Sequence, residues 1–172
     1  MPHRFLCGIF FCMKGVDTMT TVTVTEQISV ITFGNVPFED ESGFIFRIFE
    51  NAAAEKISID MISKASVSTD RTSVGFTFSD NDMPRMLNVL SRIKFYRPPL
   101  VSCGNVKIVI KSREMENGIG FARDVFSILD SISVTPILIT TSVDEISVVV
   151  RASDSTEVVR SFKEKADIIE PS

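Results

Sequence analysis

The sequence repeats itself once, and this internal repeat limits the possible folds more than any other feature does. A segment that begins at Gly43, GFIFRIFENAAAEKISIDMIS, aligns with a segment that begins at Gly120, GFARDVFSILDSISVTPILIT. The offset is 77 residues, and it also places Phe49 on Phe126. Self-similarity at a fixed period of this length indicates that one structural unit occurs twice in the chain.

Hydrophobic periodicity predicts the elements of the first copy. Alternating or apolar runs predict strands at 28–33, 57–66 and 72–78. Helical spacing predicts a helix over 44–56 and a second helix that follows Asp80, the expected N-cap residue. The residues expected to face the core from these two helices are Phe44, Ile45, Ile48, Phe49 and Ala52, and Met83, Met86, Leu87, Leu90 and Ile93.

The second copy has the same order of elements, with strands expected at 106–110, 136–141 and 146–150. A capping-box pattern at 154–157 precedes the closing helix. Each copy is therefore predicted to be a ferredoxin-like βαββαβ unit, and the fold class to be α+β, with helices on one face of each antiparallel sheet. The inward residues expected from the first helix of this copy are Phe121, Ala122, Val125, Ile128, Leu129 and Ile132.

The first eighteen residues, MPHRFLCGIFFCMKGVDT, do not follow the repeat. Their apolar run is shorter than the roughly 20 residues that span a bilayer. We expect 1–18 to be a disordered or mis-assigned N-terminal extension outside the fold. Three cysteines, of which two lie in this leader, do not form a disulfide framework, and no metal site is predicted. A reducing, cytoplasmic location is therefore expected.

Composition excludes several kinds of partner. The formal net charge is −4, and no cluster of basic residues is present, so nucleic acid is not an expected partner. The hydrophobic fraction of 44% is typical of a globular chain. We therefore expect neither a nucleic acid nor a membrane as partner.

Two βαββαβ units in tandem, with ISIDMIS in the first copy and LITTSVDEISVVV in the second, resemble the paired ACT domains at the C-terminus of aspartate kinases. In the second copy, VKIVIKSREMENGIGFA aligns without gaps on the strand-loop-helix segment of that family. The shared residues are Lys107, Met115, Gly120 and Ala122. The resemblance extends from Thr20 to about residue 168.

The resemblance implies an interleaved pair of domains. The first ACT domain is expected at 26–104 and the second at 105–172, with the segment 20–25 pairing as a strand into the second. It also implies an amino-acid-binding allosteric module of amino-acid biosynthesis, related to the regulatory region of aspartate kinase. The sequence contains no kinase catalytic domain, so we expect no enzymatic activity and no cofactor. The implied partners are free lysine or threonine, a second copy in a homodimer, and a kinase catalytic subunit.

An acidic loop, FEDES, separates the first predicted strand from the first predicted helix. The N–H groups at a helix start around Gly43 suit a carboxylate, and the carboxylates of the loop suit an ammonium. Glycine would let a ligand approach the backbone. Acidic residues also stabilise a helix N-terminus by about 0.3–1 kcal/mol without any ligand.

The resemblance extends this candidate site to both copies. The expected effector contacts are Asn35, Val36, Pro37, Glu39, Asp40, Glu41, Ser42, Gly43, Phe44, Ile45 and Lys64 in the first copy, and Met115, Glu116, Asn117, Gly118, Ile119, Gly120 and Thr135 in the second.

Two departures from the family pattern keep an alternative open. The family often has Gln where this chain has Lys64, and an ammonium cannot accept a hydrogen bond from another ammonium. Pro136 follows Thr135 at the head of a predicted strand and has no N–H to donate. The alternative is an ACT-type dimerisation or interaction protein that has lost its ligand. An acylphosphatase-like enzyme on the same plan would need a glycine-rich phosphate cradle beside Arg113 and Asn117, and the sequence has none.

Overall fold

The computed structural model of the protein describes residues 7–10, 20–113, 115 and 119–167. The chain divides into two compact units. The continuous unit spans Gln27–Gly104, and the split unit combines Met1–Glu26 with Asn105–Ser172. Two strands, β2 (Thr21–Pro37) and β5 (Leu100–Lys111), are neighbours in the sheet and contribute residues to both units.

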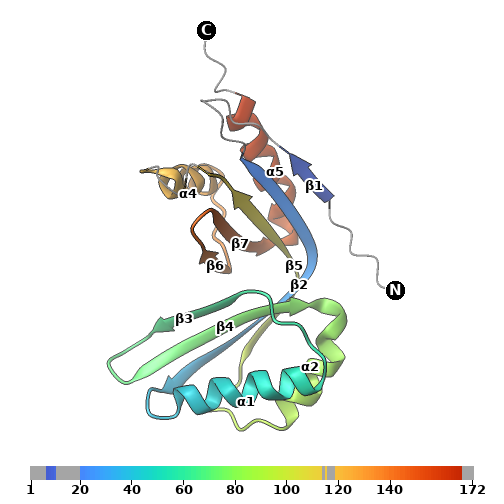
Figure 1. The fold of residues 1–172 in the computed structure, drawn as a ribbon, viewed down its shortest axis with the longest axis vertical. Coiled ribbons are helices and arrows are strands. Elements are labelled where there is room, and N and C mark those ends of the chain that lie inside the picture. Colours follow the sequence, from blue (N-terminus) through green and yellow to red (C-terminus); the bar gives the residue numbers. More distant parts are fainter. Residues whose placement is uncertain (1–6, 11–19, 114, 116–118, 168–172) are drawn as a thin grey trace. The chain divides into compact units, whose positions relative to one another are not determined.

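The continuous unit has an antiparallel sheet in which β4 lies between β3 and β2. Helices α1 and α2 lie against one face of that sheet (Figure 1). Besides its shares of β2 and β5, the unit contains α1 (Glu41–Ala54), β3 (Ile62–Ser66), β4 (Arg71–Ser79), the 3-10 helix η1 (Asp80–Asp82) and α2 (Met83–Ser91).

Phenylalanine rings fill the core of the continuous unit. Phe33 on β2 meets Phe44 on α1 edge to face, with ring centroids 5.2 Å apart, and lies 6.0 Å from Phe76 on β4. Edge-to-face and offset ring pairs are favourable beyond their apolar burial. Alternation along β2 explains the arrangement, because Ile31 and Phe33 share the face that the helices cover.

The split unit repeats this arrangement with a sheet in which β7 lies between β5 and β6. Its core combines strand residues such as Ile108 and Ile146 with Leu129 of α4 and Phe162 of α5. Val22, from the first residues of β2, belongs to the same core. Besides its shares of β2 and β5, the unit contains β1 (Cys7–Phe10), α4 (Phe121–Ser131), β6 (Leu138–Thr141), β7 (Glu145–Arg151) and α5 (Ala152–Asp167).

The predicted fold class, two interleaved ferredoxin-like units with helices on one face of antiparallel sheets, is confirmed. At each point where a strand passes from one unit to the other, one residue has a left-handed backbone. Gln27 has a φ of 58° and Gly104 a φ of 67°. Within the continuous unit, the Asp80 carboxylate accepts from Ser29 Oγ (2.5 Å) and from the Gly104 N–H (3.0 Å).

Several predicted boundaries in the continuous unit are wrong. Helix α1 begins at Glu41 rather than Phe44, because the Phe44 N–H already donates to the Asp40 carbonyl (2.8 Å) and the loop forms the first turn. Asp80 is not an N-cap, since η1 separates it from α2. Leu87 is exposed because Met86 and Val89 form the buried stripe of α2.

Regular pairing of β3 begins at Ile62, so the strand expected at 57–66 is shorter than predicted. The residues before it still follow β4 through irregular bonds, in which Thr77 accepts from the Asp60 N–H (3.0 Å) and the Met61 N–H (2.9 Å). In the split unit, Ala122 is exposed. Helix α5 begins at Ala152, so the 154–157 pattern lies within its first turns and does not cap it.

The leader differs in part from the expectation that 1–18 stay outside the fold. Strand β1 pairs antiparallel with β2, with Cys7 opposite Val24 and Phe10 opposite Thr21. The other residues of the leader, 1–6 and 11–18, lie outside the described residues.

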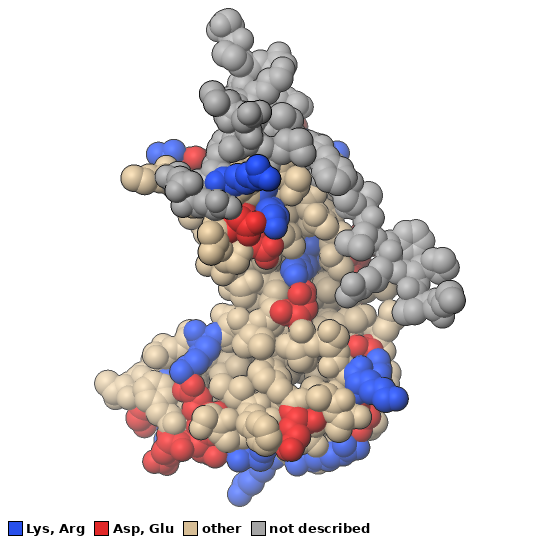
Figure 2. Space-filling model, in the orientation of Figure 1, with Lys and Arg blue, Asp and Glu red and all other residues tan. Residues whose placement is uncertain are grey.

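The surface carries charges of both signs. On the face shown in Figure 2, Lys and Arg side chains lie interspersed with Asp and Glu side chains of the described residues. No helix in the described part of the chain is both long enough and apolar enough to cross a membrane.

Candidate effector-binding site

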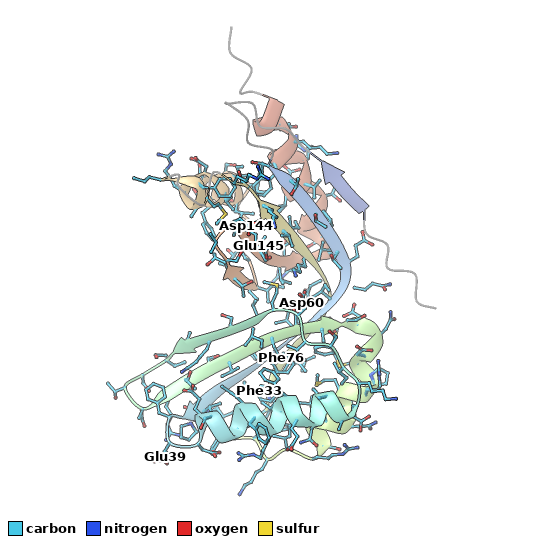
Figure 3. The ribbon with its side chains drawn as sticks, viewed as in Figure 1. Phe33, Glu39, Asp60, Phe76, Asp144 and Glu145 are labelled. Atoms are coloured by element: carbon cyan, nitrogen blue, oxygen red, sulfur yellow. The ribbon has the colours of Figure 1, made fainter. Side chains whose placement is uncertain are left out.

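The candidate site of the first copy is the junction between β2 and α1. Strand β2 has a register irregularity between Phe33 and Val36, and Asn35 there has a φ of 63°. A turn follows, in which the Asp40 N–H donates to the Pro37 carbonyl (3.2 Å). Figure 3 shows Glu39 on this turn at the end of the unit, and Phe33 inside, between the sheet and α1. Val36 is a core residue, so its side chain faces away from any effector.

The Asp40 carboxylate already has two donors. It lies at the N-cap position of α1 but makes no capping bond. It accepts instead from Arg47 Nη2 (2.9 Å), two turns along the helix, and from the hydroxyl of Tyr96 (2.5 Å). The bonds from Tyr96 and Arg47 lower the pKa of Asp40 below its usual 3.8. The same bond to Asp40 raises the pKa of Tyr96 above 10.0, because the neutral phenol donates its proton to the carboxylate in that bond.

Gly43 makes room for this pair. A Cβ atom at residue 43 would lie 3.2 Å from Arg47 Nη1 and 3.3 Å from Asp40 Oδ1, which is tighter than ordinary van der Waals contact. The space that glycine leaves is therefore occupied by the Arg47–Asp40 ion pair. The sequence-based interpretation, in which this glycine admits a ligand to the backbone, needs that pair to move.

Glu41 is the first residue of α1 and the least exposed acid of the loop. Its Oε1 lies 2.5 Å from Lys64 Nζ, and its side chain is only 15% exposed, against 51% for Lys64. The ion pair joins the start of α1 to β3. Lys64, expected as an effector contact, is thus placed against a carboxylate that was also expected to hold the effector.

The remaining groups of this junction are the Glu39 carboxylate and the first N–H groups of α1. Glu39 is exposed and makes no ion pair with any described residue. The Phe44 N–H is used within the helix and the Phe44 ring is buried, so the position for an anion shifts to the N–H groups of Ser42 and Gly43. Ile45 lies beyond that first turn.

The junction between β5 and α4 is the counterpart in the second copy. Gly120 is the N-cap residue of α4, with a φ of 108° that only glycine adopts readily. The Arg123 guanidinium lies near Gly120, since a Cβ atom there would be 3.5 Å from it. Met115 packs against the core, and Ile119 and Thr135 are exposed. Glu116, Asn117 and Gly118 were also expected here and lie outside the described residues.

Another ion pair lies at the end of β5. Lys111 Nζ is 2.8 Å from a carboxylate oxygen of Asp144 in the turn between β6 and β7, which Figure 3 labels. The bond from Lys111 holds the pKa of Asp144 below its usual 3.8. Unlike Asp40, Asp144 lies on the turn after the second strand of its copy, so the two acids are not equivalent in the repeat.

Sequence reasoning missed two residues of the first junction, Arg47 and Tyr96. Arg47 follows Asp40 by seven residues, a helical spacing that could have indicated the contact. Tyr96 follows α2 at a sequence separation of 56 residues, so only the fold places it there. No three His, Cys, Asp or Glu side chains of the described residues lie close enough together to hold a metal ion.

Comparison with known proteins gives a fold and no sequence family. No family model and no curated protein matches the chain. Among solved structures, the ligand-free regulatory subunit of aspartate kinase from Thermus thermophilus matches 81% of this chain and 93% of its own, with a TM-score of 0.72 and 20% identity. The putative C-terminal regulatory domain of aspartate kinase from Porphyromonas gingivalis matches 86% of this chain and 96% of its own, with a TM-score of 0.66 and 23% identity.

A third match is a part of a larger enzyme. Aspartokinase III of E. coli, in complex with lysine and aspartate, matches 91% of this chain and 34% of its own, with a TM-score of 0.64 and 18% identity. At these identities the matches show the fold. The chain has the fold of the aspartate kinase regulatory domains, and the resemblance inferred from its sequence is confirmed at that level.

Proposed function

We propose that this protein is a regulatory module that binds a free amino acid and controls an aspartate kinase. The observation that supports the proposal is coverage: the matched fold covers 93% of the Thermus thermophilus regulatory subunit and 96% of the putative C-terminal regulatory domain from Porphyromonas gingivalis. The module would act by binding, without catalysis.

The effector would bind at the junction between β2 and α1, at its counterpart before α4, or at both. At the first junction, the N–H groups of Ser42 and Gly43 suit the carboxylate of an amino acid, since they point out of a helix N-terminus. Two carboxylates suit the ammonium. Glu39 has no ionic partner among the described residues, and Glu41 would receive the ammonium where Lys64 moves aside. Lysine and threonine are the first amino acids to test, because the resemblance implies them and lysine is bound in the E. coli structure.

Assembly is part of the proposal. Strand β3 lies at the end of the strand order, and its residues are mostly exposed. An exposed edge strand can pair with another chain. We therefore expect a homodimer, with a kinase catalytic subunit as the regulated partner.

A second candidate function has an observation of its own in favour. Asp40 and Glu41 each already have a cation from the protein, namely Arg47 and Lys64. A site whose acids are neutralised internally suits an interaction module that has lost its ligand.

Thermal denaturation with each of the twenty amino acids at millimolar concentration separates the two candidates. A ligand at a hundredfold excess over its Kd stabilises the folded protein by about 2.7 kcal/mol. Lysine, threonine or another amino acid should raise the Tm, and replacing both Glu39 and Glu41 by Gln should reduce that shift. Glu50→Gln, an exposed acid on the outer side of α1, is the matched control and should leave it unchanged. If no amino acid shifts the Tm of the unmodified protein, the interaction module replaces the regulatory one.

A further inference from the structure

Lys64 places its ammonium against Glu41, one of the carboxylates of the proposed site. Five residue pairs fix the register of β3 against β4, and Lys64 lies opposite Val74 in it. From there the side chain reaches the first turn of α1, where its ammonium lies 2.5 Å from the Glu41 carboxylate. The group that arrives is a primary ammonium, the same chemical group that a free amino acid would bring.

Glu41 is the acid of the loop best suited to hold such a group. It is the least exposed of the three acids Glu39, Asp40 and Glu41. A charge-assisted hydrogen bond is stronger where less water surrounds it. It also lies at the N-terminus of α1, where a carboxylate is favoured by the helix dipole. An ammonium placed on Glu41 would therefore lie beside the N–H groups that suit the ligand carboxylate.

Asp40 does not offer an equivalent place. Arg47 and Tyr96 both donate to it, and even a Cβ atom at residue 43 would lie 3.2 Å from Arg47 and 3.3 Å from Asp40. Only Glu39 remains, and it is exposed on the turn. An effector that uses the buried part of the junction must therefore compete with Lys64 for Glu41.

We infer that Lys64 is an internal competitor for the ammonium of the effector, and that its ion pair with Glu41 sets the affinity of the first-copy site. This inference rests on the proposed function. A ligand that binds only the molecules in which the pair is open has its affinity reduced by that open fraction. An ion pair of ordinary strength at a partly exposed position then weakens binding about two- to fivefold.

The test uses the full chain and reads each copy separately. L-lysine and L-threonine are titrated into the protein while the amide resonances of Gly43 and Gly120 are followed by NMR. Lys64→Met removes the ammonium and keeps most of the apolar stem. Lys64→Arg keeps the charge, and Lys94→Met removes an exposed lysine of the same unit that has no ion pair with a described residue. Thermal denaturation checks that each variant is folded.

The inference predicts that Lys64→Met binds the amino acid about two- to fivefold more tightly at Gly43. Binding at Gly120 should not change, and the arginine and Lys94 variants should behave as the unmodified protein does. Equal affinity at Gly43 with and without the Lys64 ammonium overturns the inference and leaves the proposed function standing. A response at Gly120 alone does the same. No response at either glycine in any variant overturns both the inference and the proposed function.

Discussion

The two strand–helix junctions of this molecule occupy the same place in the repeat and have different chemistry. Before α1, the Asp40 carboxylate accepts hydrogen bonds from Arg47 and Tyr96, and the Glu41 carboxylate forms an ion pair with Lys64. Before α4, the N-cap is a left-handed glycine with the Arg123 guanidinium beside it. The repeat thus keeps the backbone plan and changes the charges around it. A shared fold therefore indicates where a ligand could bind, and the side chains decide whether it does.

Deleting a core ring should have the largest effect and should show whether the two units are separate. Phe33 is 1% exposed and contacts the rings of Phe44, Phe76 and Phe95. We expect Phe33→Ala to cost about 3–5 kcal/mol of unfolding free energy, because it removes a buried aromatic ring and leaves a cavity. Hydrogen exchange should show lost protection within Gln27–Gly104.

The matched change in the other unit is Ile110→Ala, since Ile110 is one repeat offset from Phe33 and is fully buried. It should cost about 2–5 kcal/mol and lower protection in the split unit. If either variant lowers hydrogen-exchange protection equally in both units, the two units unfold together and do not have separate stabilities.

A smaller effect is expected at the two left-handed crossings between the units. Gly104→Ala should destabilise by about 1–2 kcal/mol, because its φ of 67° is unfavourable for any residue with a Cβ. A Cβ there would meet no atom within 4 Å, so the cost is one of backbone conformation alone. Urea denaturation measures it.

The control for an added methyl group is Gly34→Ala, which also has open space around it and no left-handed backbone. It should be neutral or slightly stabilising. Gln27 has a Cβ atom and a φ of 58°, so its backbone is strained where that of Gly104 is not. Gln27→Gly should therefore not destabilise the folded protein. An equal loss for Gly34→Ala and Gly104→Ala would show that backbone conformation does not distinguish these glycines.

The smallest effects concern pH, and they distinguish the two copies. Because the folded pKa of Asp40 is lowered, its contribution to stability is present above pH 3.8 and is lost as the pH falls through the folded value. Asp144 of the split unit follows the same rule. Tyr96 has a raised folded pKa, so its contribution is present below pH 10.0 and is lost as the pH rises through the folded value.

Loss at alkaline pH is therefore expected at the first junction. Tyr96 is the only tyrosine and the chain has no tryptophan, so tyrosinate absorbance reports this residue alone. Asp40→Asn should move its titration midpoint back toward 10.0. An unchanged midpoint would mean that the Asp40–Tyr96 hydrogen bond is not formed in solution.

Much of the fold was predictable because periodicity follows burial directly. The alternation that places Phe33, Phe76 and Phe78 on one face is visible in the sequence, and so is the helical spacing of Val125 and Leu129. The start of α1 was not predictable in the same way. The residues FEDES suit both a loop and a first helical turn, and the choice depends on the bond from Phe44 N–H to the Asp40 carbonyl.

The candidate site was predictable in position and not in its contacts. The acidic loop marks it, but the contact of Lys64 with Glu41 depends on the register of β3 and on where α1 begins. Tyr96 reaches Asp40 from the segment after α2, which has no periodic pattern. Long-range side-chain pairs of this kind depend on tertiary geometry, which local sequence propensity does not encode.

The division of the split unit between the two ends of the chain has a consequence for biosynthesis. A ribosome completes Gln27–Gly104 as one stretch, and domains generally fold as units as they are made. The segment TVTVTE of β2 emerges earlier, yet its partner β5 and the helices of its unit come later. Until then it is a β-prone strand with open edges, the kind of segment that pairs with other nascent chains. The later-translated share of the split unit therefore determines when its earlier strand is protected.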